Sequence, residues 1–294
     1  MIELGAEVEE AQQDGSAIVA LETTLVAHGF PGGEGLDVAL EAKRRVREAG
    51  AVPATIGIVD GAIRVGLSEG ELERFASAGE AARKVGPRDL AAVLVERGLG
   101  ATTVGGTLAV CARVGIRFMG TGGIGGVHRG YAQRPDVSAD LGELARVPAL
   151  VVASGVKSLL DVPATVEVLE TLGVPVLGWR TATLPLFYAA TGGPPVPFTV
   201  ETASEAAQIA GAHWGLGRGG LLLAQPPAES LDVQAVVEAA LERASAEEVR
   251  GQDVTPFVLA HIHRETDGES VRVNKRLIVD NAALAAEVAV AAAA

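Results

Sequence analysis

Two ionisable side chains follow apolar, strand-like runs and could do covalent chemistry. Lys157 stands in VVASGVKSLLDVP, directly behind a buried type of strand. A lysine there either extends its charge to the surface or is partly desolvated, and desolvation lowers the amine pKa so that it can attack a carbonyl carbon. Glu22 follows the run IVAL, where its carboxyl group could act as a general acid, cap a helix or form an ion pair. The residues alone leave these alternatives open.

A glycine-rich segment follows another apolar run. Residues 116–130 read IRFMGTGGIGGVHRG and hold six glycines in eleven residues, an entropic cost that is tolerated where the backbone bends sharply or approaches a ligand. Residues 120–125 fit the dinucleotide-binding pattern G-x-G-x-x-G. A Rossmann site, however, needs a helix that begins inside the motif, and here the polar VHRGYAQRPD follows. We therefore favour a loop whose N–H groups bind a phosphate or ring substrate, with His128 as a turn residue or a ligand contact.

Other polar residues fit binding roles as well as ordinary structural ones. Lys84 precedes an expected helix, where it could bind phosphate or face solvent. Asp136 and Asp140 are hard oxygen ligands four residues apart, suited to Mg²⁺ or Mn²⁺ rather than zinc, or to helix capping. Asn274 and Asn281 are seven residues apart and could share a helix face.

Composition excludes several classes of protein. A formal charge of −13 argues against a nucleic-acid or anionic-membrane surface. One cysteine, Cys111, allows neither an internal disulfide nor a cysteine-based zinc site. The start lacks the order of a signal peptide, and no apolar run reaches the roughly 18 residues of a membrane span. We expect a soluble cytoplasmic protein with a small-molecule substrate.

The order of the expected elements places these residues in an α/β fold. Helical and strand-like stretches alternate, as in a parallel sheet covered by helices, and residues 55–67 read as a hairpin around Asp60-Gly61. This predicts a three-layer α/β/α sandwich with a mostly parallel, mixed-edge sheet, in one domain over 1–294 with an Ala-rich, fraying tail at 289–294. Strands are expected at 116–120, 149–153, 174–178 and 220–224, and helices at 36–50, 68–79, 87–98, 104–114, 163–172, 231–245 and 280–288.

Several motifs, taken in order, resemble the pseudouridine-5′-phosphate glycosidase family. They are LETTLVAHGFP, RKVGPRDL, GATTVGGT, MGTGGIGGVHRG, DVSADLGEL, SGVKSLLDVPATVEVLETLGVPVLGW, VTPF and DNAALAAEVA, and the resemblance extends from about residue 17 to 288. It implies reversible cleavage of the C1′–C5 bond of pseudouridine 5′-phosphate to uracil and ribose 5-phosphate. It also implies an α/β/α fold, one Mn²⁺ per subunit and a homotrimer.

The resemblance also implies roles for individual residues. Lys157 is the expected nucleophile, forming an imine-type adduct with the ring-opened sugar, and Glu22 the proton donor. Asp136 is the expected metal ligand, with Asp140 holding the water shell of the ion. The expected substrate-binding residues are Lys84, which binds the phosphate, and Thr103, Val104, Thr121, His128, Ser138, Ala139, Asp140, Asn274 and Asn281.

One departure from the family pattern keeps alternatives open. The sequence has Phe30-Pro31-Gly32-Gly33 where the family usually has Pro-Tyr-Pro after Leu or Met. A related C-glycoside or sugar-phosphate lyase acting on a different base is therefore an alternative. So are an NAD-dependent oxidoreductase built on 120–125 and a non-catalytic sugar-phosphate sensor, although a sensor would need no reactive amine.

Overall fold

The computed structural model describes residues 1–133, 135–249 and 254–294. Among these residues, no helix is both long and apolar enough to cross a bilayer. In chain order the strands are β1 (Ile2–Leu4), β2 (Ile18–Glu22), β3 (Val52–Val59), β4 (Ala62–Val65), β5 (Arg83–Val85), β6 (Gly100–Thr102), β7 (Phe118–Gly120), β8 (Val127–His128), β9 (Leu150–Ala153), β10 (Leu160–Asp161), β11 (Val176–Trp179), β12 (Phe198–Val200) and β13 (Leu221–Ala224).

Helices connect most of these strands. In chain order they are α1 (Ala6–Asp14), α2 (Thr24–His28), the 3₁₀ turn η1 (Pro31–Gly33), α3 (Gly35–Glu48), α4 (Glu69–Ala78), the 3₁₀ turn η2 (Gly79–Ala81), α5 (Leu90–Glu96), α6 (Val104–Val114), α7 (Ala139–Arg146), α8 (Val162–Thr171), α9 (Ala203–Gly215), α10 (Gln234–Ala246), α11 (Val254–Glu265) and α12 (Glu269–Ala293).

Within the described residues, eleven strands form one sheet in the order β1-β4-β3-β2-β7-β9-β13-β11-β12, and β6 and β5 extend it from β3. The run from β3 through β2 to β12 is parallel, whereas β3 pairs antiparallel with β4 and β6. The short strands β8 and β10 form a separate antiparallel pair. The predicted mostly parallel sheet with a mixed edge is confirmed.

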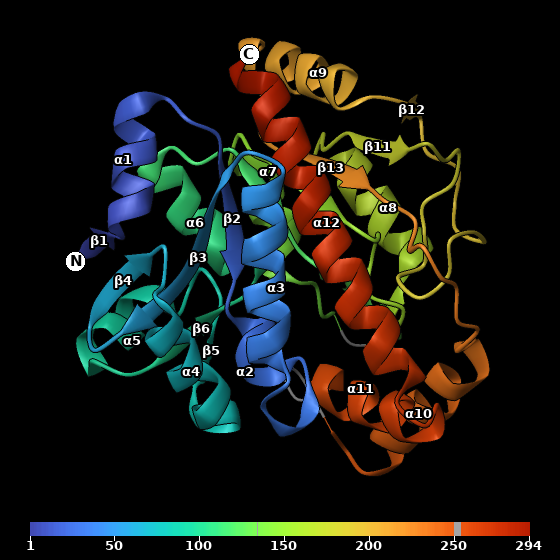
Figure 1. Ribbon diagram of the computed structural model, residues 1–294. Helices are drawn as coiled ribbons and strands as arrows, with labels where there is room; N and C mark the ends of the chain where they lie inside the picture. The colour runs from blue at the N-terminus through green and yellow to red at the C-terminus, as the bar shows by residue number, and fades with distance from the viewer. Residues whose placement is uncertain (134, 250–253) are drawn as a thin grey trace.

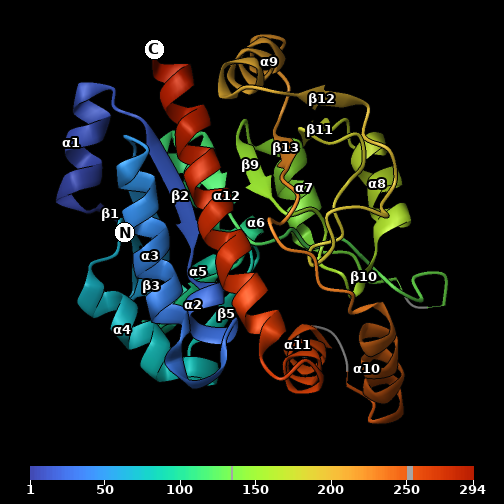
Figure 2. The ribbon, with the colours of Figure 1, turned by 45° about the vertical axis from the view of Figure 1, so that its right-hand side comes forward.

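Helices cover both faces of the sheet, as predicted. On one face α3 and α12 run side by side, and α12 packs on β2, β7 and β9 (Figure 1). On the other, α6 packs on β2 and β3, and α7 packs between α6 and α8 (Figure 2). Strands such as β9, which is buried along its whole length, form the core between the two layers. The three-layer α/β/α prediction is confirmed.

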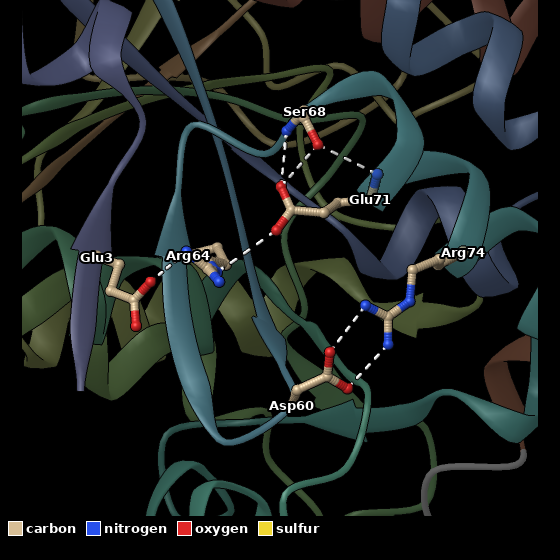
Figure 3. Close-up of polar contacts among 6 residues, drawn as sticks. All are labelled: Glu3, Asp60, Arg64, Ser68, Glu71 and Arg74. Atoms are coloured by element: carbon tan, nitrogen blue, oxygen red, sulfur yellow. Dashed lines mark hydrogen bonds and ion pairs between the residues drawn. The ribbon is translucent and has the colours of Figure 1, made fainter.

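The predicted hairpin is present, with Asp60 and Gly61 both at positive φ (53° and 88°), as a two-residue turn of the primed type requires. Arg74 on α4 donates two hydrogen bonds of 2.9 Å to the Asp60 carboxylate. Arg64 on β4 pairs with Glu71, which completes the predicted capping box with Ser68 (Figure 3). These contacts attach the antiparallel edge of the sheet to α4.

Most predicted elements lie within a few residues of the observed ones, with two exceptions. The helix expected from Pro87 begins at Leu90, because Gly86 donates a backbone hydrogen bond to the Asp89 carboxylate and closes a turn there. The helix expected at 280–288 runs over all of α12, and the Ala-rich end does not fray at 289: Ala289 is buried and the helix reaches Ala293. The packing of α12 on the sheet and on α3 stabilises the alanine-rich end of the helix, whose sequence alone does not indicate burial.

Candidate active site

Three neighbouring parallel strands bring the predicted catalytic residues to one edge of the sheet. Glu22 is the last residue of β2, and Thr121 directly follows β7. Lys157 lies four residues beyond the end of β9, which pairs with β7. Because β2, β7 and β9 are parallel and adjacent, their carboxyl ends lie at the same edge, where open α/β sheets bind ligands.

A cavity of about 1000 Å³ opens at this edge. Its wall includes five of the residues predicted to be functional: Glu22, Lys84, Thr121, Lys157 and Asn274. Lys84 lies on β5, a strand, rather than immediately before a helix as the sequence suggested. Further walls come from α2 and α11, so segments far apart in the sequence enclose one space large enough for a nucleotide.

Glu22 is buried, with 5% of its surface exposed, and the Thr121 hydroxyl donates a hydrogen bond to its carboxylate. Burial raises the pKa of the Glu22 carboxyl above its ordinary value. The positive charge of Lys157, followed by the hydrogen bond from Thr121, works in the opposite direction. A carboxyl group with a raised pKa holds its proton to higher pH, which is the property a general acid needs.

Residues 120–130, here called the glycine loop, form hydrogen bonds to other protein groups through many of their backbone N–H groups. Those of Thr121, Ile124 and His128 donate to backbone carbonyls, and that of Gly125 donates to Asp140. Among the described residues, the N–H groups of Gly122 and Gly123 have no hydrogen-bond partner, and both glycines line the cavity. The predicted phosphate-binding cradle is thus reduced to these two donors. Close packing requires glycine at Gly120, Gly125 and Gly126, whereas Gly130 has a positive φ of 83°.

Close packing around the loop explains its composition. A Cβ atom at Gly120 would lie 2.7 Å from the backbone of Ala282 on α12. One at Gly126 would lie 2.3 Å from the Thr165 hydroxyl oxygen. No helix begins within the motif: α7 begins at Ala139, so the Rossmann reading of 120–125 is wrong.

Asp140, in the first turn of α7, links the glycine loop to the start of α6. It is 4% exposed, and its two carboxylate oxygens accept 2.8 Å hydrogen bonds from the N–H groups of Gly105 and Gly125. Ser138 caps α7 beside it, accepting a hydrogen bond from the Asp140 N–H. The arrangement fixes the loop against the start of α6.

Several predicted substrate contacts are not among the residues that form the cavity wall. Thr103 caps α6 with its hydroxyl, and Val104 behind it is fully buried. Ser138 and Ala139 form the start of α7, with Ala139 exposed. His128, on β8, is half-buried, and burial lowers its pKa, as do the charges of Lys84 and Lys157, while Asp136 opposes the change. Contact of these residues with substrate stays a prediction.

The two asparagines of α12 occupy different environments. Asn281 is fully buried, and its amide donates hydrogen bonds of 2.7 Å to the Thr121 carbonyl and 3.1 Å to the Ser154 hydroxyl. It therefore fastens together the loops after β7 and β9. Asn274 lines the cavity, and its buried amide oxygen has no hydrogen-bond partner in the described part of the chain. Asn274 is the one placed to meet a ligand.

Comparison with known proteins identifies the family. Residues 7–291 match the family described as "Indigoidine synthase A like protein". A relative named pseudouridine-5′-phosphate glycosidase from Chloroflexus aurantiacus is 47% identical over 99% of this chain and 98% of its own. A relative of the same name from Roseiflexus is 48% identical over 99% and 96%. The chain belongs to the pseudouridine-5′-phosphate glycosidase family. The resemblance inferred from the motifs is confirmed.

Solved structures agree with this assignment and with the fold. The crystal structure of the prealnumycin C-glycosynthase AlnA in complex with ribulose 5-phosphate superposes with a TM-score of 0.91. It is 37% identical and covers all of this chain and 97% of its own. An indigoidine synthase A-like protein from Thermotoga maritima gives a TM-score of 0.89 at 38% identity, over 99% of this chain and 96% of its own.

The segment that departs from the family pattern forms a turn at the start of α3. Phe30 is buried in the main core, and Gly32 and Gly33 both have positive φ, 62° and 82°. His28, one residue before Gly29, lines the cavity, and its Nε2 lies 2.9 Å from the Ala82 carbonyl oxygen. Burial lowers the pKa of His28, and the hydrogen bond with Ala82 opposes this change.

Asp136, the expected metal ligand, stands without a cluster of further ligands in the part of the chain that the structure describes. In the described ranges, no group of three or more His, Cys, Asp or Glu side chains is placed to hold a metal ion. Asp136 is half-buried and follows the glycine loop, and its backbone carbonyl accepts from the His128 N–H at 3.0 Å. A single carboxylate suits a hard ion that keeps most of its water ligands. Such an ion is compatible with Asp136 as its one protein carboxylate, and Mn²⁺ binding there stays a prediction.

Some cavity residues were not predicted from the sequence. Phe187 and Ile278 line the wall beside the glycine loop, and Thr24 and Leu25 line it from α2. Apolar residues of this type are indistinguishable from core residues in one sequence, because only the folded topology places them at a cavity. His28 stood within a family motif and could have been singled out.

Proposed function

We propose that this protein reversibly cleaves the C1′–C5 bond of pseudouridine 5′-phosphate, giving uracil and ribose 5-phosphate. The observation that carries the proposal is that Glu22 and Lys157 line one cavity, with Glu22 buried so that its pKa is raised. Relatives of 41–48% identity that bear the corresponding name support an enzyme acting on a C-glycosidic bond.

The proposed role of Lys157 follows from the bond to be broken. Uracil is attached through carbon, so protonation of a leaving oxygen, as in ordinary glycosidases, offers no easy route. The amine of Lys157 would give up a proton and add to C1′ through its lone pair as the C1′–O4′ bond breaks and the sugar ring opens. The nitrogen lone pair then forms an imine-type bond to C1′ while uracil leaves and its C5 takes up a proton. Hydrolysis of the adduct by water releases ribose 5-phosphate and restores the amine.

Glu22 is the proposed proton donor for this sequence. Ring opening leaves O4′ in need of a proton, and a carboxyl group that remains protonated can supply it. The hydrogen bond from Thr121 fixes the carboxyl group at the end of β2. Lys157 lines the same cavity as Glu22, so both groups face the space in which one sugar would lie.

The phosphate end of the substrate is assigned to Lys84. Lys84 lines the cavity on β5, and its charge acts on both Glu22 and His128. Lys84 and Lys157 thus bring two basic side chains to one cavity of a protein with net charge −13, and each can attract an anionic group of a substrate. The free N–H groups of Gly122 and Gly123 are further donors for the sugar phosphate.

We propose one Mn²⁺ per subunit, held by Asp136. Asp140 would hold the water shell of the ion, since each of its oxygens keeps a lone pair beyond its hydrogen bond to the backbone. A bound Mn²⁺ supplies positive charge that stabilises an anionic phosphate or oxygen near the cavity. The homotrimer and the cytoplasmic location expected from the sequence stay predictions.

Product analysis tests the proposed function. Metal-depleted protein is incubated with pseudouridine 5′-phosphate, with and without Mn²⁺, and the mixture is analysed by liquid chromatography and mass spectrometry. Uracil and ribose 5-phosphate in equal amounts support the proposal. Folded protein that binds pseudouridine 5′-phosphate without forming products would favour the sugar-phosphate sensor. Turnover of a different C-glycoside alone would favour a changed base.

A further inference from the structure

Phe187 has a backbone conformation that a bulky residue rarely adopts. Its φ is 63°, in the left-handed region, where a side chain other than that of Gly, Asn or Asp is strained. Strained residues persist only where surrounding contacts hold them, and they gather at functional sites. Phe187 is also on the wall of the cavity that contains Glu22 and Lys157.

The Phe187 ring is wedged against the glycine loop. A Cβ atom at Gly123 would lie 2.6 Å from Phe187 Cδ2 and 2.8 Å from Cε2, so the ring occupies the space of any side chain at that position. Tyr188 also packs edge-on against this ring, with the ring centroids 4.7 Å apart at an interplanar angle of 87°. Phe187 is 4% exposed, so contacts surround the ring almost completely.

The backbone next to Phe187 is attached to the segment that carries Lys157. The Phe187 N–H donates to the Ser154 carbonyl at 2.9 Å, and Leu186 forms an antiparallel bridge with Gly155. The two backbones approach so closely that a Cβ at Gly155, whose φ is 83°, would lie 2.0 Å from the Pro185 carbonyl oxygen. Phe187 therefore contacts the glycine loop through its ring and the Lys157 segment through its backbone.

We propose that Phe187 is a positioning residue whose ring sets the separation between Gly123 and the segment that carries Lys157. The inference rests on the proposed function, in which the sugar lies between the glycine loop and the lysine. A ring that fixes this gap keeps C1′ within reach of the amine, and a misplacement of about 1 Å can cost roughly a hundredfold in rate. Lys84, the proposed main phosphate contact, lies on β5 and not on the segments that the ring contacts, so most of the substrate affinity should survive a change at Phe187.

The test compares two matched phenylalanines. Phe75 on α4 is fully buried against Gly57 in the same manner, with a Cβ at Gly57 2.8 Å from Phe75 Cζ, and it does not line the cavity. We expect Phe187→Leu to lower kcat by about ten- to a hundredfold and to change KM by less than about threefold. Phe75→Leu, which leaves a cavity of the same kind, should retain the wild-type kcat in the folded protein.

A double-mutant cycle with Gly123 gives a second test. Gly123→Ala alone should lower kcat by at least about tenfold, because the new Cβ pushes the ring away. In the Phe187→Ala background the same change should cost less than about threefold, since the space is then vacant. Equal losses in both backgrounds, or an unchanged kcat in Phe187→Leu, would overturn the inference while leaving the function intact. Wild-type protein that does not turn over pseudouridine 5′-phosphate would overturn both.

Discussion

Thr121 donates the hydrogen bond of its hydroxyl to the carboxylate of Glu22 from the end of the neighbouring strand. Ninety-nine residues of sequence separate the two, and only the pairing of β2 with β7 brings them together. The contact favours the ionised carboxylate, so it moderates the rise in the Glu22 pKa that burial causes. The Thr121 hydroxyl therefore helps to set the pKa of Glu22.

Removing this hydroxyl should change the pH dependence of turnover. If Glu22 is the acid, kcat falls as pH rises through the raised pKa of Glu22. Thr121→Val removes a bond that lowers this pKa, so the falling limb should move to higher pH. Thr199→Val, an exposed threonine of β12, should leave the limb in place. A limb that moves to lower pH in Thr121→Val would contradict this role for Glu22.

Replacing the two asparagines of α12 should have different effects on stability and on activity. Asn281→Ala should lower the free energy of unfolding by about 2 kcal/mol, because the Thr121 carbonyl and the Ser154 hydroxyl lose a buried partner. Asn274→Ala should change stability by less than about 1 kcal/mol, since its amide oxygen has no partner to lose. It should instead lower kcat/KM by about tenfold. Urea titration measures stability and steady-state kinetics measure activity. A loss of activity without loss of stability in Asn281→Ala, with the opposite result in Asn274→Ala, would contradict this assignment.

Asp140 should be important for stability. Asp140→Ala removes the acceptor of the Gly105 and Gly125 N–H groups, each a hydrogen bond to a charged group, so the free energy of unfolding should fall by about 3 kcal/mol. Asp37 is also in the first turn of a helix but is exposed, and Asp37→Ala should cost less than about 1 kcal/mol. Similar values for the two variants in urea titrations would show that the buried hydrogen bonds contribute little.

Metal binding should depend on Asp136. Asp136→Asn removes the charge of the proposed ligand, so the affinity for Mn²⁺, measured by calorimetry on chelator-treated protein, should fall by about tenfold or more. Asp60→Asn, which alters an exposed aspartate in the turn between β3 and β4 that is hydrogen-bonded to Arg74, serves as the control. Unchanged Mn²⁺ affinity in Asp136→Asn would place the ion elsewhere.

The fold was predictable because its signals are local. Apolar runs predicted the positions of the strands β7, β9, β11 and β13. The capping residues Ser68 and Glu71 predicted the start of α4. The extent of α12 was not predictable, since its alanine-rich sequence is helical only through packing on the sheet and on α3. Strands of two or three residues, such as β5 and β8, carry too few side chains to form a pattern.

The site was predictable in part. Glu22 and Lys157 stand at ends of buried strands, and the parallel order of the sheet brings such ends together. The glycine loop was read as a cradle for a phosphate, but most of its glycines are needed for close packing, as at Gly120 against Ala282. Phe187 gave no signal, because neither a positive φ nor a contact with Gly123 can be read from residue types alone.

Reductive trapping of the sugar on Lys157 tests the central claim most directly. Protein turning over pseudouridine 5′-phosphate is treated with borohydride, and its peptides are analysed by mass spectrometry. The account predicts one ribose 5-phosphate unit attached through a reduced imine to the peptide that contains Lys157, and no such modification in Lys157→Ala, which should also lack turnover. Continued turnover in Lys157→Ala, or trapping on a different lysine of the active protein, would contradict it.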